Sequence, residues 1–421
     1  MSIYLNRISD EKLSLLLQSS GAALIEGPKW CGKTRSAERM AKSALYMQDP
    51  DTAKGNITIA KTKPSLLLEG KTPRLLDEWQ VAPELWNAVR FAVDKRQSRG
   101  QFILTGSVVP TRTDDMHTGT GRIARMKMRT MSLYESGDST GEISLEALFD
   151  GEEDLSGRSE LSIEEIAFII NRGGWPESAR EKNKKLAFTI ANGYLEAVTN
   201  EDISRVDGIE KNPGRVTALM RSLSRNTTCE ARTTTILHDL NTNDESLSQV
   251  TVDLYINALK RIFVIEDLPA WSAKLRSKTA IRTTAKRHYT DPSIATASLR
   301  ATPERLLSDF NTFGLLFESL CIRDLRIYAE SIDGSVYHYR DKGGLEIDAI
   351  VQLADGRWSA VEVKLGAGEV DKASDSLLKL KQIVDINEMH EPSFLMILTG
   401  TEYAFQMRNG IWIVPLGCLK N

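Results

Sequence analysis

The sequence predicts an α/β protein with several domains, on three observations. The chain has 421 residues, enough for two to four domains of ordinary size, and its apolar fraction of 41% and charged fraction of 26% are those of globular proteins. Near residue 30 an apolar run leads through a glycine-containing loop into a helical pattern. Near residue 350 strand-like runs lie between apolar helices, so sheets covered by helices are expected in both halves.

Composition argues against several classes of protein. Segment 1–21 lacks the basic and apolar regions of a signal peptide, and no segment reaches the roughly eighteen uncharged apolar residues of a membrane span. We therefore expect a cytoplasmic protein without membrane contact. With a formal net charge of −3, contact with nucleic acid would depend on local basic patches. The absence of a CxxC pair argues against a disulfide framework and against structural zinc. The four cysteines are Cys31, Cys229, Cys321 and Cys418.

Segment 22–34, AALIEGPKWCGKT, contains a phosphate-binding loop. An apolar run precedes a match to every fixed position of the pattern GxxxxGK[ST], and a helical pattern follows. Gly32 lets the backbone approach a phosphate, and the helix directs its first amides at the anion. We expect Lys33 to reach the β- and γ-phosphates of ATP and Thr34 to bind Mg²⁺. The residues expected at the nucleotide are Gly27, Pro28, Lys29, Trp30, Cys31, Gly32, Lys33, Thr34 and Arg35.

Polar and acidic side chains follow the next two predicted strands. In PRLLDEWQ, we expect Asp77 to hold the magnesium ion through water and Glu78 to orient and deprotonate the attacking water. Adjacent acids at a strand end also occur as solvated turn residues, but the phosphate loop in the same hundred residues favours function. In GQFILTGS, Thr105 and Ser107 reach the same carboxyl edge of a parallel sheet, and we expect Ser107 to sense the γ-phosphate.

Three arginines lie downstream in segment 117–135, at positions 122, 125 and 129. An arginine supplied by a neighbouring subunit stabilises the transition state of phosphoryl transfer. Arg122 follows the flexible turn 119–121 and is our candidate for this role. The alternative is that these arginines face solvent or DNA.

The middle of the chain predicts helices. Segment 156–204 has helical apolar spacing and a Gly-Gly and Pro break near residue 175, and we interpret it as a lid. Segment 205–300 repeats helix, polar turn, helix and apolar strand, which is typical of a winged helix-turn-helix with Ser248 as a helix N-cap. Such modules bind DNA or pack against protein, and both alternatives stay open. The polar residues available on its second helix are Thr251, Asn257, Lys260 and Arg261.

A basic stretch follows at 272–291. Clustered cations attract phosphate, so this stretch favours DNA as a partner, whereas the alternative is a solvated basic loop. Its basic residues are Lys274, Arg276, Lys278, Arg282, Lys286 and Arg287.

The last hundred residues predict a helix, three strands and a second helix. Glu362 and Lys364 are two apart on one predicted strand and share a face, as Glu346 and Asp348 do on the strand before. An acid and an E-x-K pair on adjacent strands can hold one or two divalent ions that activate water. Oxygen ligands favour Mg²⁺ or Mn²⁺ over zinc. Exposed strands also alternate charged and apolar residues, so the pattern by itself is weak. Two histidines, His288 and His338, are interpreted as structural or phosphate-contacting.

Five segments together resemble a known family. GPKWCGKT, LLDEWQ, FILTGS, GRIARMKMRTMSLYE and RGGWPE are similar to segments of prokaryotic AAA-type ATPases whose C-terminal half resembles PD-(D/E)XK restriction endonucleases. The resemblance implies ATP binding and hydrolysis in a homo-oligomer, a ring or a dimer. It also implies four domains: an AAA-type core at 1–155, a helical lid at 156–204, a winged-helix domain at 205–300 and an endonuclease-like domain at 301–421.

The same resemblance assigns roles at the second site. Asp348 matches the first acid, Glu362 and Lys364 match the E-x-K pair, and Glu318 matches the acid on the preceding helix. Metal ligands would be Glu318, Asp348 and Glu362.

Two functions are compatible with these patterns. In the first, ATP hydrolysis controls a metal-dependent endonuclease that acts on DNA, including branched or junction DNA. In the second, ATP binding controls assembly or partner choice, and the endonuclease-like domain is a scaffold without catalysis.

Overall fold

The computed structural model describes residues 4–109, 118–206, 208–241, 247–272, 284–384 and 389–421. The chain forms two compact units. The first unit comprises residues 1–130, 201–211 and 257–264, and the second comprises 131–200, 212–256 and 265–421. Residues 131–155, which the sequence placed with the ATPase core, lie in the second unit. No helix in the described segments is long and apolar enough to cross a bilayer.

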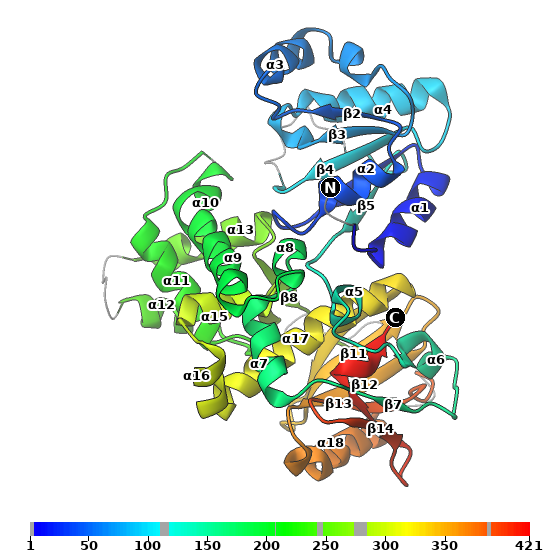
Figure 1. The fold of residues 1–421 in the computed structure, drawn as a ribbon, viewed down its shortest axis with the longest axis vertical. Coiled ribbons are helices and arrows are strands. Elements are labelled where there is room, and N and C mark those ends of the chain that lie inside the picture. Colours follow the sequence, from blue (N-terminus) through cyan, green and yellow to red (C-terminus); the bar gives the residue numbers. More distant parts are fainter. Residues whose placement is uncertain (1–3, 110–117, 207, 242–246, 273–283, 385–388) are drawn as a thin grey trace. The chain divides into compact units, whose positions relative to one another are not determined.

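The first unit is built on a parallel sheet with the strand order β2-β3-β4-β1-β5. Alternate residues of each strand face opposite sides, so Leu24 and Leu76 join one apolar cluster while Ile25 and Leu75 join another. Helices cover the sheet (Figure 1). The elements are α1 Ser9–Ser19, β1 Ala22–Glu26, α2 Lys33–Met40, β2 Ser43–Tyr46, α3 Ala53–Thr62, β3 Arg74–Asp77, α4 Glu84–Arg96, β4 Phe102–Gly106, β5 Ile123–Lys127 and α10 Ile203–Arg205.

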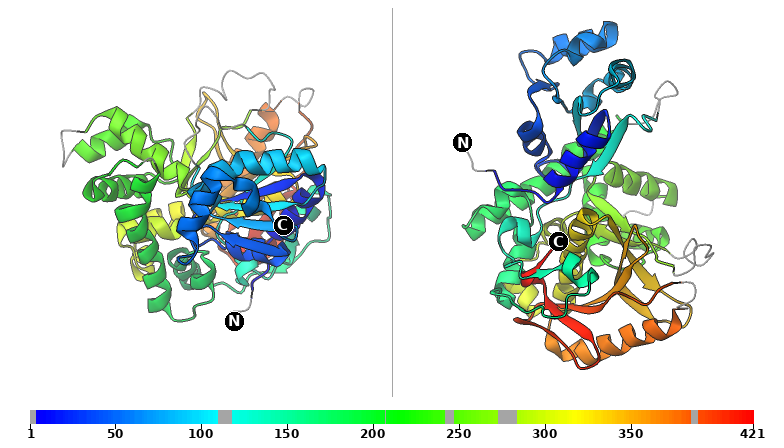
Figure 2. Two further views of the ribbon diagram at one scale, coloured as in Figure 1. Left: turned by 90° about the horizontal axis from the view of Figure 1, so that it is seen from above. Right: turned by 90° about the vertical axis from the view of Figure 1, so that its right-hand side faces the viewer.

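The second unit contains a seven-stranded mixed sheet with the order β10-β11-β12-β13-β15-β14-β7. Strands β10, β11 and β12 pair antiparallel, and β12, β13 and β15 pair parallel. Helix α17 packs on β10 to β12, and α18 packs on β11 to β13 along the sheet (Figures 1 and 2). The elements are β7 Gly157–Arg158, α17 Phe310–Ser331, β10 Gly334–Arg340, β11 Glu346–Leu353, β12 Trp358–Lys364, α18 Val370–Ile383, β13 Leu395–Thr399, β14 Tyr403–Gln406 and β15 Ile411–Pro415.

The order of α17, three strands and α18 agrees with the order predicted from the sequence. Two short strand pairings tie earlier segments to the end of the chain, because β7 pairs with β14 and β6 pairs with β16. The small elements involved are α5 Leu133–Ser136, β6 Ile143–Ser144, α6 Leu145–Phe149 and β16 Leu419–Lys420.

A mainly helical region lies between β7 and α17 in the chain. Helices α11 to α13 are followed by the antiparallel pair β8–β9, which is the element order that predicted a winged helix. Ser248 accepts a hydrogen bond from the Thr251 amide at the start of α13, as expected of an N-cap (3.2 Å). The elements are α7 Ile163–Arg172, α8 Pro176–Ala179, α9 Lys184–Ala197, α11 Pro213–Arg225, α12 Thr233–Asn241, α13 Gln249–Arg261, β8 Ile265–Leu268, β9 Lys286–Tyr289, α15 Pro292–Leu299 and α16 Pro303–Ser308.

Candidate functional site

The phosphate loop joins β1 to α2 and depends on two glycines. Gly32 has a φ of 105° at the N-cap of α2, in the left-handed region that glycine adopts without a steric penalty. A Cβ on Gly27 would lie 2.1 Å from the Met128 carbonyl oxygen. A side chain at either position would therefore distort the loop, and the predicted strand, loop and helix are all present.

Lys33 places its ammonium group inside this loop. Its Nζ donates hydrogen bonds to the carbonyl oxygens of Gly27 (3.0 Å) and Pro28 (2.7 Å), and the residue is 5% exposed. Carbonyl dipoles hold the ammonium group there without neutralising its charge. The loop thus presents a positive charge beside the first amides of α2, where phosphates bind.

Asp77 lies at the carboxyl end of β3 and accepts two hydroxyl hydrogen bonds on one oxygen. Thr34 Oγ1 and Thr105 Oγ1 each lie 2.7 Å from Asp77 Oδ1. A hydroxyl and a carboxylate oxygen are suitable ligands for Mg²⁺, so Thr34 and Asp77 fit the ion that ATP brings. When bound, the ion would screen the charge of the phosphates.

Glu78 is fixed in a strained position beside Asp77. Its φ of 55° is left-handed, and its amide donates to Thr105 Oγ1 (3.1 Å). Ser107 Oγ donates to Glu78 Oε2 (2.9 Å), and Gln80 Nε2 also hydrogen-bonds this oxygen. The acid expected to be the base and the serine expected to be the sensor are therefore in contact. Gln80 was not predicted, although its position two residues after Glu78 is a usable signal.

The other predicted loop residues have separate roles. Trp30 is 55% exposed, and the thiol of Cys31 is buried and lies 3.6 Å from the Met128 carbonyl oxygen. Arg35 pairs with Glu38 one helical turn away on an exposed face of α2 (3.2 Å). Lys29 pairs with Asp202 in the segment 201–211.

Arg122 lies at the opposite edge of the sheet from the phosphate loop. Its carbonyl oxygen accepts from the Ala22 amide at the start of β1, and its Nε lies 2.8 Å from Asp94 Oδ1. It is therefore remote from the phosphate loop of its own chain, and its action on a neighbouring subunit stays a prediction. Arg125 pairs with Glu26 (3.0 Å).

The second unit brings the predicted acids and lysine together. Lys364 Nζ lies 2.8 Å from Glu362 Oε2 and 3.4 Å from Asp348 Oδ2. The same Asp348 oxygen accepts from the Val363 amide (2.8 Å). Asp348, Glu362 and Lys364 thus form one cluster at neighbouring strands.

Lys286 joins this cluster from β9, which the sequence did not indicate. Its Nζ lies 3.4 Å from Glu318 Oε1 and 3.8 Å from Asp348 Oδ1, and its side chain is 7% exposed. Acids and lysines therefore alternate across what we call the acid–lysine cluster: Glu318, Lys286, Asp348, Lys364 and Glu362.

Charge in the acid–lysine cluster is nearly balanced. Burial and the Asp348 carboxylate raise the pKa of Glu318 to about 7 and that of Glu362 to about 8. Burial lowers the pKa of Lys286 and Lys364, but the adjacent carboxylates outweigh it and leave both pKa values raised. Three acids and two lysines have one excess negative charge, which a proton on Glu362 removes.

The acid–lysine cluster contains two ammonium groups where a divalent ion was predicted. Within the described segments, no three His, Cys, Asp or Glu side chains converge on a position where they could hold a metal. The two ammonium groups already lie between the carboxylates that would be ligands. Glu318, Asp348 and Glu362 as ligands of one metal ion therefore stay a prediction, and Lys286 lies where it already pairs with two of them.

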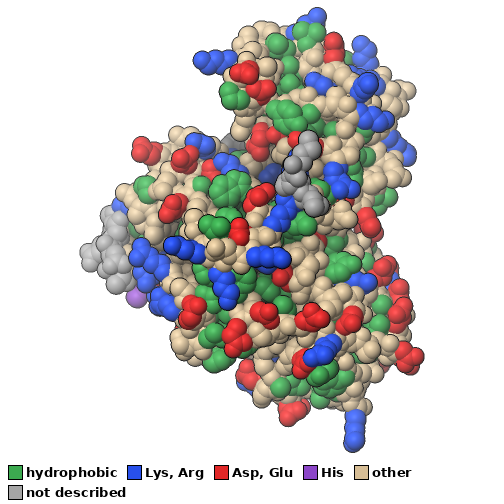
Figure 3. Space-filling view, viewed as in Figure 1, with side chains coloured by type: hydrophobic (Ala, Val, Ile, Leu, Met, Phe, Trp, Pro, Cys, Tyr) green, Lys and Arg blue, Asp and Glu red, His purple; other side chains and the backbone are tan. Residues whose placement is uncertain are grey.

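Several residues that were expected to face DNA contact other groups of the protein. Arg261 donates to the carbonyl oxygens of Val109 and Val206, and Arg287 lies 3.7 Å from Asp267, so neither is a free surface cation. Lys260 and Asn257 are partly buried and exposed, respectively. Basic and acidic side chains are interspersed on the face in Figure 3. The remaining basic residues of the stretch lie outside the described residues: Lys274, Arg276, Lys278 and Arg282.

The two histidines singled out from the sequence, His288 and His338, are buried. Burial lowers the pKa of His338 to about 4, helped by Lys286, and lowers the pKa of His288 well below its usual value. Both imidazoles are therefore neutral at pH 7, which is compatible with a structural role.

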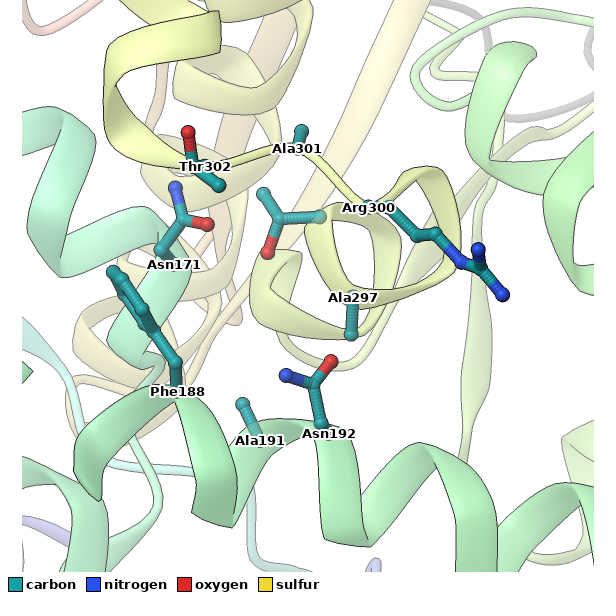
Figure 4. A pocket seen from close by; sticks show the side chains of 9 residues that line it. Asn171, Phe188, Ala191, Asn192, Ala297, Arg300, Ala301 and Thr302 are labelled. Carbon is teal, nitrogen blue, oxygen red and sulfur yellow. The ribbon is translucent and has the colours of Figure 1, made fainter. Parts of the chain in front are cut away.

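A separate cavity of about 330 Å³ lies among the helices of the second unit. The amides of Asn171 and Asn192 and the ring of Phe188 border it, while the guanidinium of Arg300 points away (Figure 4). Asn171 donates its amide to the Ala167 carbonyl oxygen (3.0 Å). No charged group of the lining residues points into this cavity, so it gives no indication of a substrate.

Comparisons with known proteins agree with the first site. Residues 19–136 match the family described as AAA domain. The first unit contains a P-loop ATPase core. Residues 163–305 match a domain of unknown function (DUF8612), and residues 313–419 match another (DUF4143). The search of curated proteins finds no match.

Two solved structures are similar at low identity. The Walker-type ATPase PABY2304 of Pyrococcus abyssi has 14% identity and a TM-score of 0.42, over 70% of this chain and 96% of that one. AMPPCP-bound DnaA from Aquifex aeolicus has 13% identity and a TM-score of 0.29, over 62% and 89%. These likenesses are too distant to add to the argument from geometry.

Proposed function

We propose that the first unit binds ATP with Mg²⁺ and hydrolyses it. Lys33 neutralises the β- and γ-phosphates, Thr34 and Asp77 hold the ion, and Glu78 orients and deprotonates the attacking water. Ser107 contacts the γ-phosphate and links it to Glu78. The observation that carries this proposal is the continuous hydrogen-bond network of Thr34, Asp77, Thr105, Glu78 and Ser107, which begins at the residue after Lys33.

Substitution of Lys33 tests the proposal. Lys33→Ala removes the charge at the phosphates, and we expect ATP affinity to fall at least about tenfold, since a charge-assisted hydrogen bond is worth about 1.5–3 kcal/mol. Calorimetric titration of the full chain with ATP and Mg²⁺ measures this. Lys54→Ala, an exposed lysine on α3, is the matched control and should bind as the unchanged protein does. Equal ATP affinity in all three proteins would overturn the proposal.

We further propose that ATP acts as a switch and that the acid–lysine cluster is structural. Lys286 supports this assignment, because its ammonium group already satisfies Glu318 and Asp348. In this proposal nucleotide binding changes assembly or partner choice, with a homo-oligomer as one form. The predicted winged helix is the candidate contact for DNA or protein.

Metal-dependent DNA cleavage is the competing proposal. The convergence of Asp348, Glu362 and Lys364 favours it, since this is the arrangement expected of an acid and an E-x-K pair. The test incubates the protein with ATP and Mg²⁺ or Mn²⁺ on duplex, single-stranded, forked and four-way junction DNA. Under the switch proposal no DNA is cut, and Asp348→Ala leaves nucleotide-dependent binding intact. Cleavage that Asp348→Ala abolishes would establish an endonuclease instead.

A further inference from the structure

The phosphate loop makes an ion pair that its own motif does not require. Lys29 occupies a variable position of GxxxxGK[ST], yet its Nζ lies 2.5 Å from Asp202 Oδ1. The Lys29 side chain is 38% exposed, whereas that of Asp202 is 9% exposed. The carboxylate is thus held close to the loop, where the phosphates of ATP must arrive.

Asp202 ends an unusual helical turn. Residues Val198–Asp202 form a π-helix, a rare conformation that recurs at functional sites. The chain passes from the second unit to the first within this turn, because residues up to 200 belong to the second unit and 201–211 belong to the first. A change at Asp202 therefore acts next to one of the points where the chain passes between the two units.

Arg261 makes a second connection at the same edge of the first unit. Its Nε donates to the Val109 carbonyl oxygen, and the Val109 amide donates to the Arg261 carbonyl oxygen, both at 3.0 Å. Val109 is two residues beyond Ser107. Arg261 also donates to the Val206 carbonyl oxygen (3.1 Å), so it fixes segment 201–211 beside the strand that ends in the sensor.

We propose that the Lys29–Asp202 pair senses ATP, an inference that rests on the proposed ATP site. The phosphates add several negative charges near Lys29, and they both compete for its ammonium group and repel the Asp202 carboxylate. ATP binding thus opens the pair and releases the π-turn, while Arg261 keeps the rest of segment 201–211 in place. Asp202 is a positioning residue and does not touch the reacting atoms.

The proposal predicts that replacing Asp202 makes ATP binding tighter. If ATP must break the pair, removing the carboxylate removes that cost, and Asp202→Asn should bind ATP more tightly by about fivefold, as expected for one partly exposed ion pair. A residue that only supports the fold would weaken binding when it is replaced. Glu201→Gln is the matched control, because Glu201 is exposed and pairs with Arg205 (2.6 Å).

The experiment combines ATP titration with hydrogen exchange of the full chain. In the unchanged protein, a non-hydrolysable ATP analogue with Mg²⁺ should speed exchange of the amides of residues 198–206. In Asp202→Asn these amides should exchange fast without nucleotide and respond little to it, whereas Lys29→Arg should retain the response. Unchanged or weaker ATP affinity in Asp202→Asn, or a normal exchange response, would overturn this inference. If the unchanged protein does not bind ATP, the proposed ATP site fails instead.

Discussion

The two lysine-containing sites of this chain differ in what surrounds the ammonium groups. In the phosphate loop, Lys33 is bonded to two neutral carbonyl oxygens, and Asp77 is bonded to hydroxyl groups. In the acid–lysine cluster, Lys286 and Lys364 each lie against carboxylates. The first site therefore keeps separate charges that a ligand can use, and the second neutralises its own.

This difference supports the proposal that the first site binds a ligand and that the second stabilises the fold. ATP and Mg²⁺ bring charges of both signs, and the first site offers a matching cation and carboxylate. A divalent ion in the second site would have to displace Lys286 from Glu318 and Asp348. Lysines and acids thus occur in both sites, and their contacts decide whether their charges are available to a ligand.

The largest expected effect is on ATP turnover. Glu78→Gln keeps the side-chain shape and an oxygen that can accept from Ser107, but it removes the basic carboxylate. We expect kcat to fall by about 10²- to 10⁴-fold while ATP remains bound, because general base catalysis contributes about this much. Phosphate release and calorimetric ATP titration measure the two quantities.

Glu69→Gln is the control for this variant, since Glu69 is an exposed acid of the same unit. It should hydrolyse ATP at the rate of the unchanged protein. Normal turnover in Glu78→Gln would show that another group activates the water.

The next effect concerns stability and compares the lysines directly. Lys364→Met leaves one buried and two partly buried acids with one ammonium group, and we expect the free energy of unfolding to fall by about 3 kcal/mol, the cost of breaking a buried pair. Lys33→Met should cost about 1 kcal/mol, because only hydrogen bonds to neutral carbonyl groups are lost. Denaturant titration measures both.

Lys379→Met, at an exposed position of α18, should change stability little. If Lys364→Met and Lys33→Met proved equally destabilising, the distinction between the two sites would be lost.

The proximity of the residues in the first site could be predicted from the sequence because its determinants are local. The glycines, Lys33 and Thr34 lie within one loop, and a parallel sheet brings Asp77 and Ser107 to the same edge whatever the rest of the chain does. The second site depends on a contact between elements far apart in the chain. Lys286 lies in a basic stretch that suggested DNA, and nothing nearby indicated that β9 directs it toward Glu318.

The division of the chain was also only partly predictable. Helix and strand order in the C-terminal part followed from apolar spacing, and Ser248 was correctly predicted as a cap. Segment 201–211 joins the first unit through non-local contacts such as those of Asp202 and Val206. No local pattern encodes such contacts, because each partner is an ordinary residue in its own segment.

The last expected effect is a pH dependence of stability that arises in the acid–lysine cluster. The pKa of Glu362 is raised to about 8 by burial and by Asp348, above that of an exposed glutamate in the unfolded chain. Between these two pKa values the folded state binds more protons than the unfolded state, so stability is greatest at low pH and falls as pH rises toward 8. We expect stability to fall between pH 5 and pH 8, measured by denaturant titration at each pH. Glu362→Gln should remove the contribution of Glu362 and leave that of Glu318, whose pKa is also raised, whereas Glu369→Gln, an exposed control, should leave the whole dependence unchanged. If stability instead rose over this range and Glu362→Gln did not change it, the carboxylates of the cluster would be fully ionised, as in a cation-binding centre.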